Sequence, residues 1–323
     1  MSGGDPSQSA APRWPAQVER ARGALLAAAC GDAVGAPFEG TQVVQPAAVL
    51  RWADAADPLR YTDDTALMLT LAEHLADRDP PGIDQDLLAA AFAETWQDAP
   101  GRGYSATTAH VFRRVLAGTP WRTAAAEAFA GRGNHGNGAA MRVAPVGLLP
   151  GPLPAIAGLA RASAAVTHAH PLAQDGAAVQ ACAVAHAYRT DPGRPVRPAD
   201  LLGMLAGQVS QPAFQARLRR LAVLARVPYV PRDVAAQLGN DASALATVPA
   251  ALAAFLHSPD DPVEAVHFAV AIGGDTDTIA ALAAALAGAR TGEGAVPARW
   301  RARLEHEQRI RAVATRLAGH VVS

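Results

Sequence analysis

The chain has 323 residues, with 28 basic and 29 acidic side chains, and its formal charge is -1. Half of the residues are hydrophobic and 18% are charged, which excludes a disordered polyampholyte and indicates a globular protein. No lysine occurs, so chemistries that need one are excluded, among them a Schiff base and a Walker A phosphate site. The balanced charge also gives no electrostatic basis for nonspecific nucleic-acid binding.

Two cysteines, Cys30 and Cys182, are too few for a cysteine-based zinc or iron–sulfur site. We therefore expect a reducing, cytoplasmic location and no disulfide framework. The run from Gly23 to Cys30, after Arg20 and Arg22, resembles a lipoprotein signal, but it is short and begins late in the chain. We expect neither a cleaved signal nor association with a membrane.

Residues 1–13, rich in Ser, Pro, Gly and Ala, are predicted to be a flexible tail, and residues 14–323 a single domain. Apolar residues recur at helical spacing from Leu67 to Leu75 and from Leu87 to Trp96. Similar patterns predict helices at about 104–117, 121–130, 172–189, 213–225, 243–257, 262–271, 276–290 and 298–317. Convincing strand alternation is absent, so the predicted class is all-α, a compact bundle without a fixed repeat. The Pro- and Arg-rich segment 191–240 is either a cap or an insertion.

The first cluster of polar residues, Thr62-Asp63-Asp64-Thr65, comes directly before the helix that starts near Leu67. Thr62 is a good N-cap, and acidic residues are favourable at the positive end of a helix dipole. Taken alone, this cluster is therefore explained by helix capping.

The second cluster is Gly273-Gly274-Asp275-Thr276-Asp277-Thr278, before a helix so apolar that it must be buried. One carboxylate is enough to cap a helix, and buried carboxylates without cations are costly. Neither cluster contains a basic residue, so metal ions are the simplest compensation. Carboxylate and hydroxyl oxygens suit Mg²⁺ or Mn²⁺, and two half-sites suggest two ions.

A third segment, from Gly31 to Gly40, is predicted to end a helix at glycine and to present Asp32 and Glu39 in a turn. Helix termination explains the glycines and Pro37 without any function. Glu39 is not explained in this way, and it is a candidate acid, base or movable metal ligand.

The fourth segment, from Gly133 to Arg142, is a loop of small residues expected to run into an apolar helix and to cradle an anion with its amides. The fifth, Thr167-His168-Ala169-His170-Pro171, is open to two interpretations. It is either a His-x-His metal pair, or Pro171 starts a helix and His168 caps it or contacts phosphate.

Taken together and in this order, the five segments resemble the ADP-ribosylglycohydrolase family, over about residues 20–302. The resemblance rests on the Thr-Asp-Asp-Thr, Gly-Asn-Gly-Ala-Ala-Met-Arg, Thr-His and Gly-Gly-Asp-Thr-Asp-Thr-Ile-Ala motifs. It implies an all-α fold with a dinuclear Mg²⁺ or Mn²⁺ centre that removes ADP-ribose from a modified substrate. The bond cleaved would be at the anomeric carbon of the ribose distal to adenine.

The same resemblance implies roles for individual residues. The metal ligands would be Thr62, Asp63, Asp64, Asp275, Asp277 and Thr278, and the catalytic residues Glu39, Asp64 and Asp275. The substrate-binding residues would be Asp98, Gly101, Tyr104, Gly136, Asn137, Gly138, Ala139, Met141, His168 and Gly274. The resemblance is least specific for the leaving-group contacts, since Ser105 stands where the family often has glycine.

Two other functions compete with this hypothesis. One is a binding protein of the same fold that holds ADP-ribose, or a crystallin-like protein, without turnover; the intact carboxylates argue against it. The other is an HD-type phosphohydrolase, whose His-Asp signature is absent from the sequence. The leaving group, whether arginine, serine, another ADP-ribose, an acetyl ester or a modified base, and the oligomeric state are not determined by the sequence.

Overall fold

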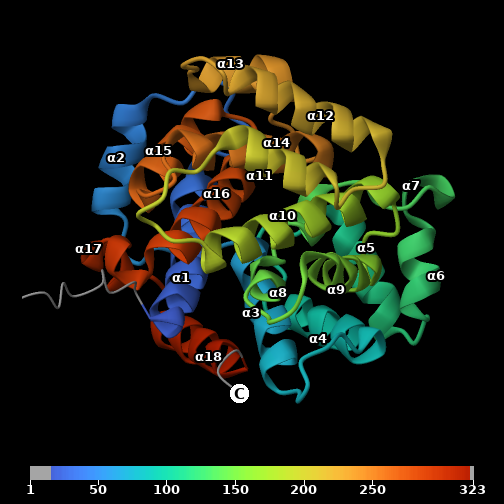
Figure 1. The fold of residues 1–323 in the computed structure, drawn as a ribbon. Coiled ribbons are helices and arrows are strands. Elements are labelled where there is room, and N and C mark those ends of the chain that lie inside the picture. The colour runs from blue at the N-terminus through green and yellow to red at the C-terminus, as the bar shows by residue number, and fades with distance from the viewer. Residues whose placement is uncertain (1–15, 321–323) are drawn as a thin grey trace, which may run out of the picture.

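Two helices that lie far apart in the sequence form the centre of the fold (Figure 1), α1 (Gln17–Gly35) and α16 (Thr276–Thr291). Both are buried along most of their length because they consist largely of alanine and other small residues. Glycines let the two backbones approach closely. A Cβ atom on Gly23 would lie 2.5 Å from the carbonyl oxygen of Gly288, and one on Gly35 would lie 2.6 Å from the Cα of Asp277. The beginning of α16 is thereby held against the end of α1.

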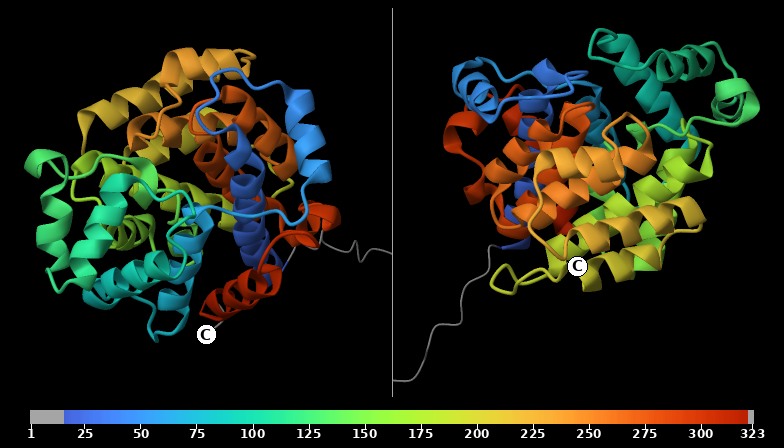
Figure 2. Two further views of the ribbon diagram at one scale, coloured as in Figure 1. Left: turned by 180° about the vertical axis from the view of Figure 1, so that it is seen from behind. Right: turned by 90° about the horizontal axis from the view of Figure 1, so that it is seen from above.

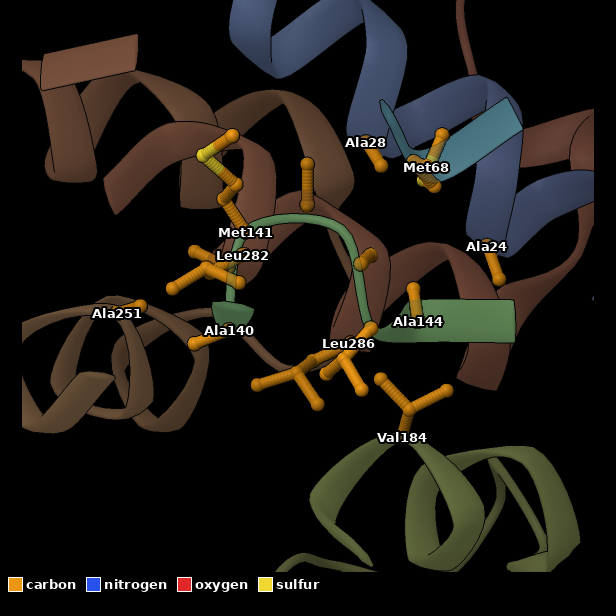
Figure 3. Packing of buried hydrophobic residues seen from close by; sticks show 14 of the residues in the cluster. Ala24, Ala28, Met68, Ala140, Met141, Ala144, Val184, Ala251, Leu282 and Leu286 are labelled. Carbon is orange, nitrogen blue, oxygen red and sulfur yellow. The ribbon is translucent and has the colours of Figure 1, made fainter. Parts of the chain in front are cut away.

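Larger apolar side chains surround this pair. Figure 3 shows Leu282 and Leu286 of α16 beside Met141 and Ala144, with Val184 of a third helix facing them. Seen from behind in Figure 2, α1 runs through the middle of the molecule with the other helices around it. Each fully buried leucine contributes about 1.5–3 kcal/mol to stability, so this centre is a rigid base for the turns at its ends.

The computed structural model describes residues 16–320, and within this range it contains helices and no β-strand. Helices of the first half are α2 (Pro46–Ala55), α3 (Asp63–Ala76), α4 (Gln85–Asp98), α5 (Ala106–Leu116), α6 (Trp121–Ala126), α7 (Ala128–Gly131), α8 (Ala144–Gly147) and α9 (Leu153–Ala165). Those of the second half are α10 (Pro171–Arg189), α11 (Pro198–Ala206), α12 (Pro212–Leu224), α13 (Pro231–Leu238), α14 (Ala244–His257), α15 (Pro262–Ile272), α17 (Ala298–Arg301) and α18 (Glu307–Gly319). Short 3₁₀ turns occur at Ala36–Phe38, Asn137–Ala139 and Glu293–Ala295.

The predicted all-α class is confirmed, while some helix boundaries were wrong. The predicted helix 121–130 is divided at Glu127 into α6 and α7, and within α7 Phe129 and Ala130 adopt left-handed backbone angles. The predicted helix 298–317 is also two, α17 and α18, separated around His306, which has a φ of 55°. The predicted tail, residues 1–13, lies outside the described residues.

The segment 191–240 forms α11, α12 and α13, which pack against α10, α14 and α15. In Figure 1, α12 and α13 cross the upper edge of the molecule. The segment is therefore a layer of the bundle, and its end leads into the loop before α14.

The apolar run from Gly23 to Cys30 is part of the buried helix α1. The helix ends at a glycine of the third segment, Gly35, and Asp32 therefore lies on its buried face and not in the turn that was predicted. No helix within residues 16–320 has both the length and the apolar character needed to cross a membrane.

Candidate metal and ligand site

The two aspartate clusters meet in space, although more than 200 residues separate them in the sequence. The N-termini of α3 and α16 and the turn after α1 border one cavity of about 380 Å³. The predicted site residues that line it are Glu39, Asp63, Asp64, Gly136, Asn137, Gly138, Met141, Asp275, Asp277 and Thr278. The fold thus brings together most of the predicted acidic residues and most of residues 136–141, which we call the glycine turn.

Three carboxylates are close enough to share a cation. Oxygen atoms of Glu39, Asp275 and Asp277 lie within 4.8 Å of one another. Buried oxygens of two aspartates, Asp64 Oδ2 and Asp277 Oδ1, have no hydrogen-bond partner in the protein. None of the ion pairs among the described residues involves these carboxylates. Orphaned, buried carboxylate oxygens without a basic partner fit a hard divalent cation.

The electrostatics of the site agree with that fit. Burial, reinforced by the neighbouring carboxylates, raises the pKa of Asp63 and the pKa of Asp277 to about 8 each. The pKa values of Asp64 and Asp275 are also raised, again with burial as the main cause. In the absence of a cation these groups therefore retain protons that exposed aspartates lose near pH 4.

The N-terminus of α3 is fixed to α1 by hydrogen bonds to the carboxylate of Asp32. This carboxylate accepts hydrogen bonds from the amide of Thr62 at 3.0 Å, the amide of Thr65 at 3.0 Å and the hydroxyl of Thr65 at 2.6 Å. Thr62 is also the N-cap of α3, since its hydroxyl accepts from the Asp64 amide at 3.2 Å. The predicted capping role of Thr62 is confirmed, while Asp32, expected in a turn, is instead a buried support for the aspartates.

The turn that carries Glu39 is fixed to the turn before α16 by two backbone hydrogen bonds. The amide of Gly40 donates to the carbonyl of Gly274 at 2.8 Å, and the amide of Gly274 donates to the carbonyl of Thr41 at 2.9 Å. Glu39 is exposed beside Asp277, and partial burial, followed by repulsion from Asp277, raises its pKa. The carboxyl is therefore at the rim of the acidic group, where it is free to exchange protons with solvent.

The glycine turn 136–141 differs from its predicted form. It contains the 3₁₀ turn Asn137–Ala139, and the apolar helix expected after it is the short, buried α8. The Asn137 side chain donates to Asp275 and, at 2.9 Å, to the hydroxyl of Thr247. The backbone amide of Asn137 donates to the carbonyl of Ala242 at 2.9 Å. Asn137 therefore couples the glycine turn to Asp275, which occupies the N-cap position of α16.

The histidines of the fifth segment have separate roles. His170 is the N-cap of α10, its Nδ1 accepting from the Leu172 amide at 3.1 Å, so the capping role considered for His168 was wrong. His168 is 1% exposed, beneath Gly136 and Gly138. No histidine belongs to the acidic group within the described residues, which argues against a His-x-His metal pair.

Several predicted residues do not line this cavity. Thr62 and Gly101 border a neighbouring cavity of about 490 Å³, which shares Glu39 and Gly103 with the first. Asp98 is exposed at the end of α4, and Ala139 is fully buried. Metal binding by Thr62 stays a prediction, as does substrate binding by Gly101, Asp98 and Ala139.

Tyr104 and Gly274 also lie outside the lining of the first cavity. The Tyr104 ring packs edge-on against Phe112, with its hydroxyl buried and unpartnered. Gly274 approaches protein backbone: a Cβ atom there would lie 2.1 Å from the carbonyl oxygen of Asn240. Close packing against Asn240 therefore explains why a glycine occupies position 274. A contact with substrate stays a prediction for both Tyr104 and Gly274.

The sequence interpretation missed other residues that line the cavity. They are Thr107 and Thr108 of α5, Phe129, and the turn Asp241, Ala242 and Ser243 before α14. The only signal for the last three was a short polar stretch after the segment 191–240.

An all-α fold and a buried group of carboxylates without basic partners among residues 16–320 define a protein with a candidate divalent-metal site in a ligand-sized cavity. Comparison with known families extends this conclusion, since the model of the ADP-ribosylglycohydrolase family matches residues 13–322. The chain belongs to the ADP-ribosylglycohydrolase family.

Individual relatives agree with this assignment. The chain is 33% identical to the ADP-ribosylhydrolase ARH3 of Xenopus tropicalis, over 88% of this chain and 91% of that protein. It is 32% identical to the protein of the same name from Homo sapiens, over 88% of each. A solved structure described as an ADP-ribosylglycohydrolase-related protein complex is 28% identical, with a TM-score of 0.71 over 94% of this chain and 98% of that one. The chain is therefore a hydrolase that acts on ADP-ribosyl groups.

Proposed function

We propose that the protein removes ADP-ribose from a modified substrate by hydrolysing the bond at the anomeric carbon of the ribose distal to adenine. Two Mg²⁺ or Mn²⁺ ions would be held by Thr62, Asp63, Asp64, Asp275, Asp277 and Thr278. The observation that carries the proposal is the meeting of Glu39, Asp275 and Asp277 within 4.8 Å at one cavity. Two further buried carboxylates, Asp63 and Asp64, line the same cavity.

When bound, such ions supply Lewis-acid polarisation and orientation of ligand oxygens and water. The residues of the chain account for the remaining steps. Hydrolysis forms a bond from a water oxygen to the anomeric carbon, breaks the bond to the leaving group, and transfers a proton from the water to the leaving atom. Glu39, with its raised pKa and its exposed position at the rim, takes the proton from the water and returns one to the leaving atom.

We place the ADP-ribose diphosphate against the glycine turn. Four backbone amides of this turn already donate within the protein, those of Gly136, Asn137, Ala140 and Met141. Fewer amides are therefore available to bind an anion than the sequence suggested. Gly136 and Gly138 line the cavity without side chains, so an anion can approach the backbone of the turn closely. The distal ribose would then lie toward the carboxylates and the leaving group toward the cavity that shares Glu39 and Gly103.

The experiment that tests the proposal measures free ADP-ribose released from a panel of substrates, with Mg²⁺ or Mn²⁺ and after chelation. The panel contains ADP-ribosylated arginine and serine, poly(ADP-ribose), the O-acetyl ester and an ADP-ribosylated base. Release from at least one substrate, lost on chelation and restored by metal, is expected. Turnover that survives exhaustive chelation would contradict the metal centre, and release of a product other than ADP-ribose would contradict the bond assignment.

We also propose a reducing, cytoplasmic location, which the two buried free thiols, Cys30 and Cys182, support. The proposed partner is an ADP-ribosylated protein or small molecule.

A further inference from the structure

A buried arginine lies directly behind the glycine turn. Arg142 has no exposed surface, and its guanidinium donates to the carbonyl of Gly138 at 3.0 Å, the carbonyl of Ser163 at 3.2 Å and the hydroxyl of Thr167 at 2.7 Å. The guanidinium also stacks over the Phe92 ring at 4.3 Å. It lies outside the metal group, and the proposed reaction does not use it.

The Thr167 hydroxyl lies between Arg142 and a buried histidine, His168, and is within hydrogen-bond distance of both. Its Oγ1 lies 2.7 Å from Nδ1 of His168, and both side chains are 1% exposed. A guanidinium only donates, so Oγ1 accepts from Arg142. The hydroxyl hydrogen then needs an acceptor, because a buried donor without one is costly. Nδ1 of His168 is the acceptor in contact with it.

An accepting Nδ1 leaves the imidazole proton on Nε2. Burial, followed by repulsion from Arg142 and His135, lowers the pKa of His168 well below its usual value, so the ring is neutral and carries a single proton. The Nε2 atom lies under the glycine turn: it would be 3.0 Å from a Cβ atom on Gly138 and 3.7 Å from one on Gly136. Both glycines line the cavity.

We propose that Arg142 and Thr167 are positioning residues that hold His168 as the neutral Nε2–H tautomer, so that its one N–H is directed to the glycine turn. Its use as a donor to a ligand oxygen rests on the proposed function, which places the ADP-ribose diphosphate at that turn. A fixed donor of this kind needs no reorganisation when the anion arrives, and it adds to affinity without adding a charge.

The proposal is tested on the full chain labelled with ¹⁵N-histidine. Long-range ¹H–¹⁵N correlation spectra distinguish the two neutral tautomers, and the signals of His168 are assigned by their loss in His168→Gln. Calorimetry measures the affinity for ADP-ribose in parallel. We expect the Nε2–H tautomer in the free wild-type protein and in Thr167→Ser, which keeps the hydroxyl.

In Thr167→Val, which removes the hydroxyl and keeps the shape, we expect His168 to leave the single Nε2–H state and the affinity for ADP-ribose to fall about tenfold. Thr70→Val is the matched control. Thr70 of α3 also has a buried hydroxyl, which is hydrogen-bonded to the Ala66 carbonyl in α3 and to the Thr95 hydroxyl in α4, and its loss should leave both readouts unchanged.

The outcomes separate the two proposals. A proton on Nδ1 in the wild-type protein, or an unchanged tautomer and affinity in Thr167→Val, overturns the positioning role even where ADP-ribose binds as expected. The expected tautomers in a protein that fails to bind ADP-ribose support the positioning role and contradict the proposed function.

Discussion

Asp32 and Thr65 are joined twice, through the hydroxyl of Thr65 at 2.6 Å and its amide at 3.0 Å. Asp32 belongs to α1 and Thr65 to the first turn of α3, so this pair attaches the Asp63-Asp64 turn to the central helix. Since α1 also packs closely on α16, the same helix sets the distance between the two aspartate clusters.

Replacing Asp32 with alanine removes the acceptor of two backbone amides and a hydroxyl. We expect the free energy of unfolding to fall by about 2 kcal/mol, because burying unsatisfied donors costs more than the relief of a buried charge returns. Thr65→Val, which loses only the hydroxyl, should cost about 1 kcal/mol. Denaturant unfolding of both variants checks this order, and equal stability of Asp32→Ala and wild type would contradict it.

Asp277→Asn should abolish metal binding at one position at least and lower turnover by about 10² or more, the scale of a lost catalytic group. Its fold should stay cooperative, because the substitution removes repulsion among buried carboxylates. Metal titration by calorimetry and thermal melts of the same sample separate these effects. Asp200→Asn, at an exposed position of α11, serves as the control and should keep full activity.

Stability of the metal-free protein should depend on pH through this group. The pKa values of Asp63 and Asp277 are raised to about 8, so the native state holds protons that the unfolded chain loses above about pH 4. The unfolded state then binds fewer protons, and this group's contribution to stability falls as pH rises from about 4 to about 8.

Divalent metal requires the deprotonated carboxylates, so the rise in melting temperature on adding Mg²⁺ or Mn²⁺ should grow over the same range. Melting curves with metal and with chelator from pH 5.5 to 8.5 measure it. A metal-induced shift that stays constant with pH, or that is undiminished in Asp277→Asn, would show that the ion binds elsewhere.

Gly138→Ala should lower the affinity for ADP-ribose by about tenfold. Its Cβ atom would lie 2.9 Å from Cε1 of His168, so either the turn or the ring must move. Gly158→Ala is the matched control: no atom lies within 4 Å of its Cβ position in α9, and a slight gain in stability is expected. Calorimetry with ADP-ribose compares the two variants, and equal affinities would contradict the placement of the diphosphate at this turn.

Glu39→Gln keeps the shape of the side chain and removes its basicity. We expect kcat to fall by about 10² or more, while the affinity for ADP-ribose and the melting temperature change little, because this side chain is exposed. A purely structural role predicts the reverse, with a lower melting temperature and normal turnover per folded molecule. Near-normal kcat would exclude Glu39 from proton transfer.

The sequence by itself determined the features that depend on neighbours along the chain. Helical periodicity and the absence of strand alternation established the all-α class. Thr62 and the aspartates beside it are recognisable because capping and first-turn charge are local effects. The excess of carboxylates before α16 indicated a metal site because no basic residue lies nearby to neutralise them.

The tertiary structure decided what depends on contacts between distant segments. Asp32 accepts hydrogen bonds from Thr62 and Thr65, which lie 30 and 33 positions further along the chain. A glycine is needed at position 274 because the backbone of Asn240 lies against it. Phe129 and Ala130 adopt left-handed backbone angles in a segment where local periodicity predicts a continuous helix. The contact of Thr167 with Arg142 is likewise invisible in the sequence, because hydrogen bonds of buried side chains are fixed only once the helices have packed.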